Sequence, residues 1–314
     1  MVNHSIINVA WCTDANYLEY VATSMISVKM NNLYQKLAFY VFVYDVNNDD
    51  IEKLKSTCDN VQVIKIEKEA IEKYSSDFAT KHLNRSTYMR LAVPRLLQGK
   101  VDNFIYLDAD TLCFDDISDI NNVDISEVIC AVSHDSLDIE DDKHAKRLGL
   151  KTKHYFNAGF LYINVNNWIE NDVENKANTV LFEKGNTLPY FDQDALNIAM
   201  DGQVRFIDNQ WNFLFNWFTE EQKETFFYHA DTTPKIVHFT GGRKPWYREH
   251  TGLAQQLYAF YHHFTPWRNA PLRSYAPRMR PTDYRVYARQ HARKGHYLAA
   301  AGWYIKYLQS KLRK

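Results

Sequence analysis

The sequence lacks the motifs and long apolar runs that mark several common classes of protein. It contains no G-x-G-x-x-G and no G-x-x-x-x-G-K-[ST] segment, which disfavours a hydride-transferring dinucleotide enzyme and a P-loop ATPase. No apolar run reaches the roughly 18 residues that a membrane-spanning helix needs. Residues 1–5 show no basic region followed by a long apolar stretch, so we expect no secretory leader.

Cysteine is scarce, and its spacing excludes the common zinc and disulfide frameworks. Cys12, Cys58, Cys113 and Cys130 form no C-x-x-C pair and show no Cys/His spacing typical of zinc sites. Cys113 and Cys130 fall in apolar segments that we expect to be buried, which favours reduced thiols and a cytoplasmic location. With 314 residues, of which 46% are hydrophobic and 24% charged, the chain is typical of a globular protein with a full core.

Charge is distributed unevenly along the chain. Residues 266–314 contain 12 Lys/Arg and a single acidic residue, Asp283, although the whole chain has a net charge of −1. Prolines interrupt the helical pattern at the start of this segment: Pro266, Pro271, Pro277 and Pro281. We therefore predict a catalytic domain at residues 1–265 and a basic, aromatic tail at 266–314, whose last 30 residues form an amphipathic helix.

The composition of this tail favours attachment to an anionic membrane surface. Aromatic and apolar residues alternate with basic ones, as at membrane interfaces: Tyr284, Arg285, Tyr287, Arg289, Trp303, Tyr304, Lys306, Tyr307, Leu308 and Lys311. A merely solvated helix is the alternative. We expect no nucleic-acid partner, because no recognised binding fold accompanies the basic residues.

Strand and helix patterns alternate along the chain. This order predicts a Rossmann-like α/β fold with a mixed, mostly parallel sheet and helices on both faces. Strands are expected at 6–12, 37–44, 61–66, 104–107, 128–132, 159–164 and 235–239, and helices at 17–30, 49–56, 86–97, 171–183 and 193–200. The polar, acidic stretch at 133–155 is expected to form a surface loop.

Two carboxylates follow the apolar strand expected at 104–107. Because alternate residues of an extended chain face the same way, Asp108 and Asp110 would point together at the carboxyl edge of the sheet, where ligands collect. Carboxylate oxygens suit Mg²⁺ or Mn²⁺. The pattern alone is not specific, since Asp192-Gln193-Asp194 repeats it. Asp192 and Gln193 have a second interpretation as residues that cap the following helix.

Five segments in order make the interpretation specific. They are C-T-D-A-N-Y at 12–17, S-T-Y-M-R-L at 86–91, Y-F-N-A-G at 155–159, Y-F-D-Q-D at 190–194 and H-F-T-G-G-R-K-P-W at 238–246. Together with D-A-D, the chain resembles the family 8 retaining glycosyltransferases over roughly residues 5–250. This family has a GT-A-like fold. The bacterial lipopolysaccharide galactosyltransferases are more similar than glycogenin, through F-N-A-G, D-Q-D and G-x-x-K-P-W.

The resemblance implies a role for each matching residue. Asp108, Asp110 and His238 would bind Mn²⁺, for which Mg²⁺ is a possible substitute, because an imidazole donor favours Mn²⁺. The uridine pocket would contain Cys12, Asp14, Asn16 and Tyr17, and the phosphates would meet Gly241 and Lys244. The rest of the donor site would comprise Arg90, Asp108, Ala109, Asp110, Asn157, Ala158, Asp192 and Gln193. Ala15 and Arg243 depart from the family's usual residues. His134 and Asp135, which follow a predicted strand, are our candidates for the acceptor site.

The activity implied by the resemblance is transfer of a hexose, galactose in the first place, from UDP-hexose to a saccharide acceptor. The product would be an α-glycoside of lipopolysaccharide or lipooligosaccharide, made on a lipid-linked core at the cytoplasmic face of the inner membrane. Alternatives are a UDP-glucose-dependent glucosyltransferase, a glycogenin-like initiator, a non-catalytic sugar-nucleotide-binding protein and a nucleotidyltransferase that releases pyrophosphate.

Two routes would retain the anomeric configuration. In one, Asp192 or Gln193 attacks as a nucleophile; in the other, the acceptor enters on the face that UDP leaves. We favour the second route, because an amide is a poor nucleophile.

Overall fold

The computed structural model describes residues 6–67, 85–135, 140, 142–229, 232–250 and 252–312. The chain forms two compact units: unit 1 comprises Met1–Phe213 and Thr233–His238, and unit 2 comprises Leu214–Thr232 and Phe239–Lys314. The segment at 239–265 thus belongs to the same compact unit as the predicted tail, and the functional division at residue 265 remains a prediction. Residues 1–5, and residues 138, 139 and 141 of the acidic segment, lie outside the described part.

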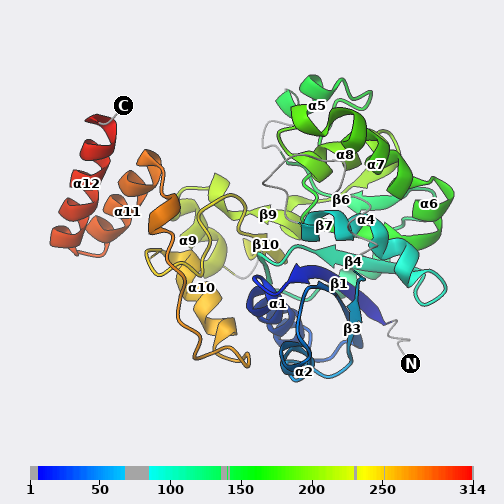
Figure 1. Cartoon of the computed structure of the whole chain (residues 1–314), viewed down its shortest axis with the longest axis horizontal. Helices are drawn as coiled ribbons and strands as arrows, with labels where there is room; N and C mark the ends of the chain where they lie inside the picture. Colours follow the sequence, from blue (N-terminus) through cyan, green and yellow to red (C-terminus); the bar gives the residue numbers. More distant parts are fainter. Residues whose placement is uncertain are drawn as a thin grey trace. The chain divides into compact units, whose positions relative to one another are not determined.

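Unit 1 is built on a seven-stranded sheet with the strand order β3-β2-β1-β4-β7-β6-β8. Figure 1 labels β3, β1, β4, β7 and β6 of this sheet. β3, β2, β1 and β4 are parallel, β7 is antiparallel to both β4 and β6, and β8 is parallel to β6. The mixed, mostly parallel sheet confirms the predicted fold class. The strands are β1 (Ile7–Asp14), β2 (Leu37–Tyr44), β3 (Val61–Lys65), β4 (Asn103–Leu107), β6 (Cys130–Val132), β7 (Phe160–Asn164) and β8 (Val204–Phe206).

Helices cover both faces of this sheet because strand residues alternate between them. On one face, the indole N–H of Trp11 in β1 donates to Ser24 of α1 at 3.1 Å. On the other face, Ala10 and Cys12 join a buried core with residues of α4, α6, α7 and α8. Within the described residues, unit 1 has the helices α1 (Leu18–Asn31), α2 (Asn48–Lys55), α4 (Arg85–Leu97), α5 (Lys143–Leu148), α6 (Val165–Glu170), α7 (Val173–Lys184) and α8 (Phe191–Ala199).

Strand register brings distant residues to one place at the carboxyl edge. Leu107, the last residue of β4, pairs with Phe160 of β7, and the N–H of Asp108 donates to the carbonyl of Gly159 at 2.9 Å. A second, smaller sheet has the order β5-β10-β9. In it, β5 (Thr111–Cys113) pairs antiparallel with β10 (Ile236–His238), so that His238 lies opposite Thr111. β9 (Phe213–Leu214) begins at the residue where the long segment of unit 1 ends.

The expected surface loop at 133–155 is wrong in part, because it contains the helix α5. The buried carboxylate of Asp142 caps this helix: its Oδ1 accepts from the N–H groups of His144 and Ala145. Gly149, at φ 67°, ends it. The short helix α6 was also missed; Asn164 caps it by accepting from the N–H of Asn167. Both helices have only six residues, too few for a clear helical period.

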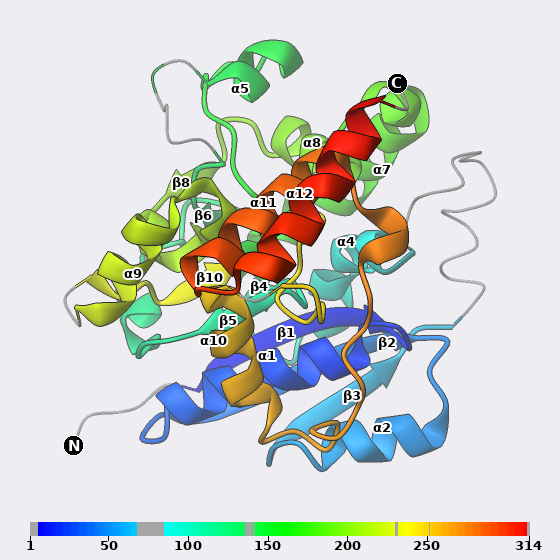
Figure 2. The same cartoon turned by 90° about the vertical axis from the view of Figure 1, so that its left-hand side faces the viewer.

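Unit 2 contains α9 (Glu220–Tyr228), α10 (Leu253–His262), α11 (Pro281–Arg293) and α12 (Tyr297–Leu312). The single amphipathic helix expected over the last 30 residues is wrong: two helices lie side by side there (Figure 2). The break falls at Gly295, whose φ of 75° ends α11. Trp303 of α12 packs against Tyr284 and Tyr287 of α11. Among the helices of the described residues, none combines the length and the hydropathy needed to span a bilayer.

Candidate active site

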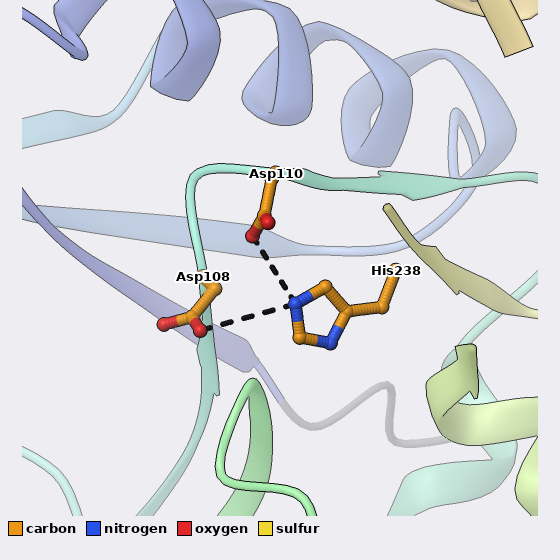
Figure 3. A group of neighbouring side chains, drawn as sticks. All are labelled: Asp108, Asp110 and His238. Carbon is orange, nitrogen blue, oxygen red and sulfur yellow. Dashed lines mark ion pairs between the residues drawn. The ribbon is translucent and has the colours of Figure 1, made fainter. Parts of the chain in front are cut away.

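Three side chains that could hold a metal ion converge at the carboxyl edge of unit 1. One ligand atom from each of Asp108, Asp110 and His238 lies within 4.8 Å of the others. His238 Nε2 is 3.2 Å from Asp110 Oδ1 and 4.0 Å from Asp108 Oδ2, and the three groups point toward one another (Figure 3). Two carboxylates and one imidazole form a donor set that suits a divalent metal ion.

The surroundings of His238 fit such an ion. Its Nδ1 lies 3.0 Å from Asn212 Oδ1, where a ring proton on Nδ1 would be donated; in that tautomer the Nε2 lone pair would face the carboxylates. Gly159 provides the space for the ring, since a Cβ at this position would lie 2.1 Å from His238 Cε1. The resemblance assigned a role to neither residue, yet both lie directly against the imidazole.

The two oxygens of Asp108 have separate partners. Oδ1 accepts from Arg90 Nη2 at 2.9 Å and from the hydroxyl of Tyr106 at 3.1 Å. Oδ2 is the oxygen on the His238 side. The guanidinium of Arg90 also lies over the ring of Tyr106, 5.0 Å from its centroid. Asp108 is therefore oriented by one oxygen and has the other available to a metal ion.

Arg90 connects Asp108 to Asp192. Its Nε lies 3.0 Å from Asp192 Oδ2 in an ion pair, and its Nη1 donates to the carbonyl of Ala158 at 2.8 Å. Burial lowers the pKa of Arg90, but the two carboxylates outweigh burial and raise it overall. Burial, reinforced by Asp108, raises the pKa of Asp192 to about 6 against the opposing effect of Arg90.

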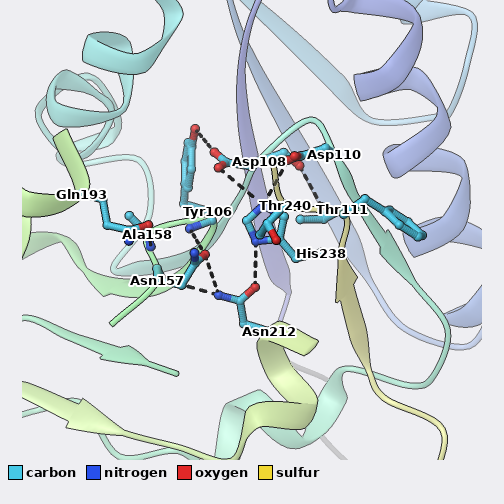
Figure 4. A network of polar contacts seen from close by, with 12 residues as sticks. Tyr106, Asp108, Asp110, Thr111, Asn157, Ala158, Gln193, Asn212, His238 and Thr240 are labelled. Carbon is cyan, nitrogen blue, oxygen red and sulfur yellow. Dashed lines mark hydrogen bonds and ion pairs between the residues drawn. The ribbon is translucent and has the colours of Figure 1, made fainter. Parts of the chain in front are cut away.

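Asn157, Asp135 and Gln193 form a second polar group (Figure 4 shows Asn157 and Gln193). Asp135 accepts from Asn157 Nδ2 at 2.9 Å and from Gln193 Nε2 at 3.3 Å. Gln193 Nε2 also donates to the hydroxyl of Tyr155 at 3.0 Å, and its Oε1 accepts from the N–H of Ala158 at 3.1 Å. Burial raises the pKa of Asp135, and the hydrogen bond from Asn157 opposes that shift. The structure thus joins Asp135 to residues predicted for the donor sugar.

His134, a candidate for the acceptor site, packs against an aromatic side chain. The ring of His134 stacks on the ring of Phe206 with centroids 4.1 Å apart, and burial lowers the pKa of His134.

The N-cap residue of α8 is Tyr190, and no side chain caps the helix at this end. The interpretation of Asp192 and Gln193 as the helix cap is therefore wrong.

The residues predicted for the uridine pocket lie in the last part of β1 and directly after it. Cys12 is buried, and burial raises the pKa of its thiol. Asp14 ends the strand, and its Oδ1 accepts from the N–H of Asn16 at 2.8 Å. Tyr17 meets the ring of Tyr20 edge-on at 5.3 Å. Their contact with a nucleotide remains a prediction.

The residues predicted for the phosphates belong to unit 2. Gly241 has a φ of 76°, and Lys244 Nζ donates to the carbonyl of Phe239 at 2.8 Å. Between them, Arg243 Nε lies 3.9 Å from Asp283 Oδ1. Ala109, by contrast, lies half-buried in the turn of unit 1 that carries Asp108 and Asp110.

Asp194 of the second Asp-x-Asp pair has a structural role that the pattern did not reveal. It is fully buried, forms a double hydrogen bond with Arg147 at 2.7 and 3.1 Å, and accepts from the hydroxyl of Tyr155 at 2.6 Å. Nothing in the sequence links Arg147 to Asp194. Tyr106, in contrast, was recognisable, since it lies on the same side of β4 as Asp108.

Comparisons of the sequence with a family model and with curated proteins both find glycosyltransferases. The family model described as Glycosyl transferase family 8 matches residues 8–250. Lipopolysaccharide 1,2-glucosyltransferase of Escherichia coli K12 is 28% identical over 270 residues, which cover 84% of this chain and 79% of the relative. Lipopolysaccharide 1,3-galactosyltransferase of Salmonella typhimurium LT2 is 28% identical over 318 residues, 97% of this chain and 91% of the relative.

A solved structure shows the same fold. The galactosyltransferase LgtC, in complex with donor and acceptor sugar analogs, has a TM-score of 0.71 at 20% identity, covering 84% of this chain and 99% of that chain. The residues matched by the family model include β4 and the Asp108-Ala109-Asp110 segment that follows it, α4 with Arg90, and β10 with His238. The chain belongs to glycosyltransferase family 8.

Proposed function

We propose that the protein transfers a hexose, with galactose preferred, from UDP-hexose to a saccharide acceptor of lipopolysaccharide or lipooligosaccharide, and that it forms an α-glycosidic bond. The names of the two lipopolysaccharide transferases support the pathway and the reaction class. The observation that carries the proposal is the convergence of Asp108, Asp110 and His238, with His238 Nδ1 already satisfied. Such an arrangement suits a metal that binds the diphosphate of a sugar nucleotide.

In this proposal Asp108, Asp110 and His238 hold Mn²⁺, for which Mg²⁺ can substitute. The bound ion would supply Lewis-acid stabilisation of the negative charge that develops on UDP as the bond to the sugar breaks. Lys244 contributes a positive charge to the same diphosphate, and Gly241 allows the backbone to approach it. Cys12, Asp14, Asn16 and Tyr17 bind uridine.

The donor sugar is held by Arg90, Asn157, Ala158, Asp192 and Gln193. The amide of Gln193 has hydrogen-bond partners at both ends, which supports a positioning role rather than nucleophilic attack. Asp192 would face the positively charged sugar ring or bind its hydroxyl groups. We therefore favour front-face transfer, in which the acceptor enters on the side that UDP leaves. Asp135 and His134 remain the candidates for the acceptor side.

Hydrolysis of a panel of sugar nucleotides with Mn²⁺ and no acceptor tests this proposal. Slow release of UDP from UDP-galactose alone would support the proposed donor, whereas preference for UDP-glucose would favour a glucosyltransferase like the E. coli relative. Mn²⁺-dependent UDP binding without hydrolysis indicates an enzyme that needs its acceptor, or a binding protein. Released pyrophosphate, or no UDP binding at all, contradicts the proposal.

The tail is proposed to attach the enzyme to the anionic cytoplasmic face of the inner membrane, where a lipid-linked core acceptor resides. Apolar side chains on α12 are exposed, and Lys306 and Lys311 lie on the same helix. These apolar residues are Tyr297, Leu298, Tyr304, Ile305, Leu308 and Leu312. Exposed apolar groups beside basic residues are typical of helices that lie in a membrane interface.

A further inference from the structure

We propose that Asn212 is a positioning residue that fixes the tautomer of His238 and couples this metal ligand to the donor-sugar side of the site. The inference rests on the proposed metal role of His238. Asn212 ends the 3₁₀ turn Asn209–Asn212 and is 1% exposed. Nothing in the sequence singled it out, since it lies within an aromatic run that resembles core.

The amide of Asn212 has a different partner at each end. Its Oδ1 lies 3.0 Å from His238 Nδ1, and its Nδ2 donates to Asn157 Oδ1 at 3.0 Å (Figure 4). A primary amide has one carbonyl acceptor and one NH₂ donor. Because the NH₂ group is directed to Asn157, the carbonyl must face His238.

The orientation of Asn157 is fixed in turn by the backbone. Its Oδ1 accepts from the N–H of Gly159 at 3.0 Å, and a backbone N–H can only donate. Its Nδ2 therefore points the other way and donates to Asp135 at 2.9 Å. This orientation does not depend on the ionisation of any side chain.

A directed chain of hydrogen bonds follows from these contacts. The N–H of Gly159 orients the amide of Asn157, Asn157 orients Asn212, and Asn212 accepts the Nδ1 proton of His238. The imidazole then keeps its lone pair on Nε2, the nitrogen near Asp110. Asp135 also accepts from Gln193, so the chain extends to the residues proposed for the sugar. A metal ligand and a sugar-binding residue thus share one hydrogen-bond network.

Two substitutions separate the two ends of Asn212. Asn212→Ala removes the acceptor for His238, and loss of such a partner lowers metal affinity about 10–100-fold. Asn212→Asp keeps an oxygen for His238 Nδ1, so Mn²⁺ affinity should be equal or higher. It also replaces the donor to Asn157 with an acceptor, so binding of UDP-galactose should weaken relative to UDP.

Binding measurements on the full chain test the inference without relying on turnover. Mn²⁺ affinity is measured from the EPR signal of the free ion, and UDP and UDP-galactose affinities by calorimetry with saturating Mn²⁺. Asn32→Ala is the matched control: Asn32 is similarly buried and hydrogen-bonded, but its partners are in α1 and at Cys113 and Ile117. This control should lower the melting temperature and leave Mn²⁺ affinity unchanged.

The outcomes distinguish this inference from the proposed function. If Asp110→Ala abolishes Mn²⁺ binding while Asn212→Ala binds Mn²⁺ like the wild type, the positioning role is overturned. If Asn212→Asp distinguishes UDP from UDP-galactose as the wild type does, the coupling is overturned. If Asn212→Ala does not fold, weaker Mn²⁺ binding by Asn212→Asp than by the wild type would overturn the positioning role. If Asp110→Ala itself binds Mn²⁺ normally, the proposed metal site fails.

Discussion

The carboxyl edge of unit 1 and helix α12 of unit 2 differ in which side chains they bury: the edge buries polar groups, whereas α12 exposes apolar ones. At the edge, polar side chains are buried: Asn212 is 1% exposed and His238 is 4% exposed. On α12, apolar side chains are exposed: Leu298 is 93% exposed and Leu312 is 87% exposed. Each arrangement departs from the usual preference for burying apolar groups and exposing polar ones.

The physical cost of the two departures differs. A buried polar group is unfavourable unless it has partners, and at this edge His238, Asn212 and Asn157 satisfy one another. Loss of one member leaves others unpaired, so substitutions there should have large effects. An exposed leucine does not depend on a hydrogen-bond partner. Substitutions of exposed residues on α12 should therefore leave the carboxyl edge of unit 1 unchanged. The predictions below test this contrast.

The largest effect is expected for Asp110→Ala. Asp110 is half-buried beside His238, and its loss removes one of three ligands from the proposed metal site. We expect turnover to fall about 10³-fold or more, since a bound metal contributes several kcal/mol of transition-state stabilisation. Released UDP is measured in chelator-treated buffer with added Mn²⁺, and thermal melting reports folding.

Asp102→Ala is the control for this variant. Asp102 is exposed at the opposite, amino end of β4. It should retain both turnover and melting temperature. Near-normal turnover by Asp110→Ala would contradict the metal assignment.

A large effect is also expected for Gly159→Ala. The added methyl group would lie 2.1 Å from His238 Cε1 and 2.5 Å from Nδ1, so the imidazole must move. A displacement of about 1 Å at a catalytic site costs on the order of 10²-fold in rate. Mn²⁺ affinity and turnover should fall together.

Gly302→Ala is the comparison on α12. A Cβ at this position meets nothing within 4 Å, and replacing glycine in a helix with alanine stabilises by about 1 kcal/mol. The same chemical change should thus impair one region and stabilise the other. If Gly159→Ala bound Mn²⁺ like the wild type, the close approach to His238 would not matter for the metal.

An intermediate effect is expected from the ionisation of Asp192. Burial raises its pKa to about 6, above the value of about 3.9 for an unfolded chain. Between these values the folded state binds more protons, so the contribution of Asp192 to stability is present below about pH 4 and is lost as the pH rises through about 6. The expected difference between the two limits is about 2–3 kcal/mol.

Urea unfolding of the wild type and of Asp192→Asn at pH 4 and pH 7 measures this difference. The asparagine variant does not titrate, so its stability relative to the wild type should increase toward pH 7. An identical pH dependence of the two proteins would show that Asp192 ionises normally. If its charge is needed to hold the sugar, wild-type turnover should also rise through about pH 6.

Much of unit 1 was predictable because its signals are local. The strand at 104–107 and Asp108 and Asp110 follow from a short apolar run and its end, and the parallel sheet follows from the alternation of strands and helices. The position of His238 relative to them came only from the resemblance. It depends on the pairing of β5 with β10, three residues each, which have no readable period.

Other features were not predictable for physical reasons. Asn212 lies between Trp211 and Phe213, where apolar neighbours indicate core, and its importance arises from partners far along the chain. The break between α11 and α12 depends on the positive φ of Gly295, a conformation that a glycine permits but does not impose. Contacts between residues far apart in the chain produce no regular residue spacing from which they could be predicted.

The smallest effect on turnover is expected on α12, and the structure shows how to isolate it. A deletion from residue 266 would remove Asp283 of α11, which is fully buried and accepts from Tyr275 and from the N–H of Arg280. Asp283 also lies 3.9 Å from Arg243, the neighbour of Lys244, so that deletion would disturb the proposed phosphate loop. Substitutions confined to exposed positions avoid this difficulty.

The triple variant Leu298→Ser, Leu308→Ser and Leu312→Ser removes exposed apolar groups and leaves Trp303 packed on α11. We expect it to lose binding to phosphatidylglycerol vesicles in a sedimentation assay, because each buried apolar side chain contributes about 1.5–3 kcal/mol. Hydrolysis of UDP-galactose should change less than twofold, since these residues lie outside the predicted donor site. Retained vesicle binding would contradict the membrane role of α12. A loss of hydrolysis as large as that of Gly159→Ala would show that the two regions are not independent.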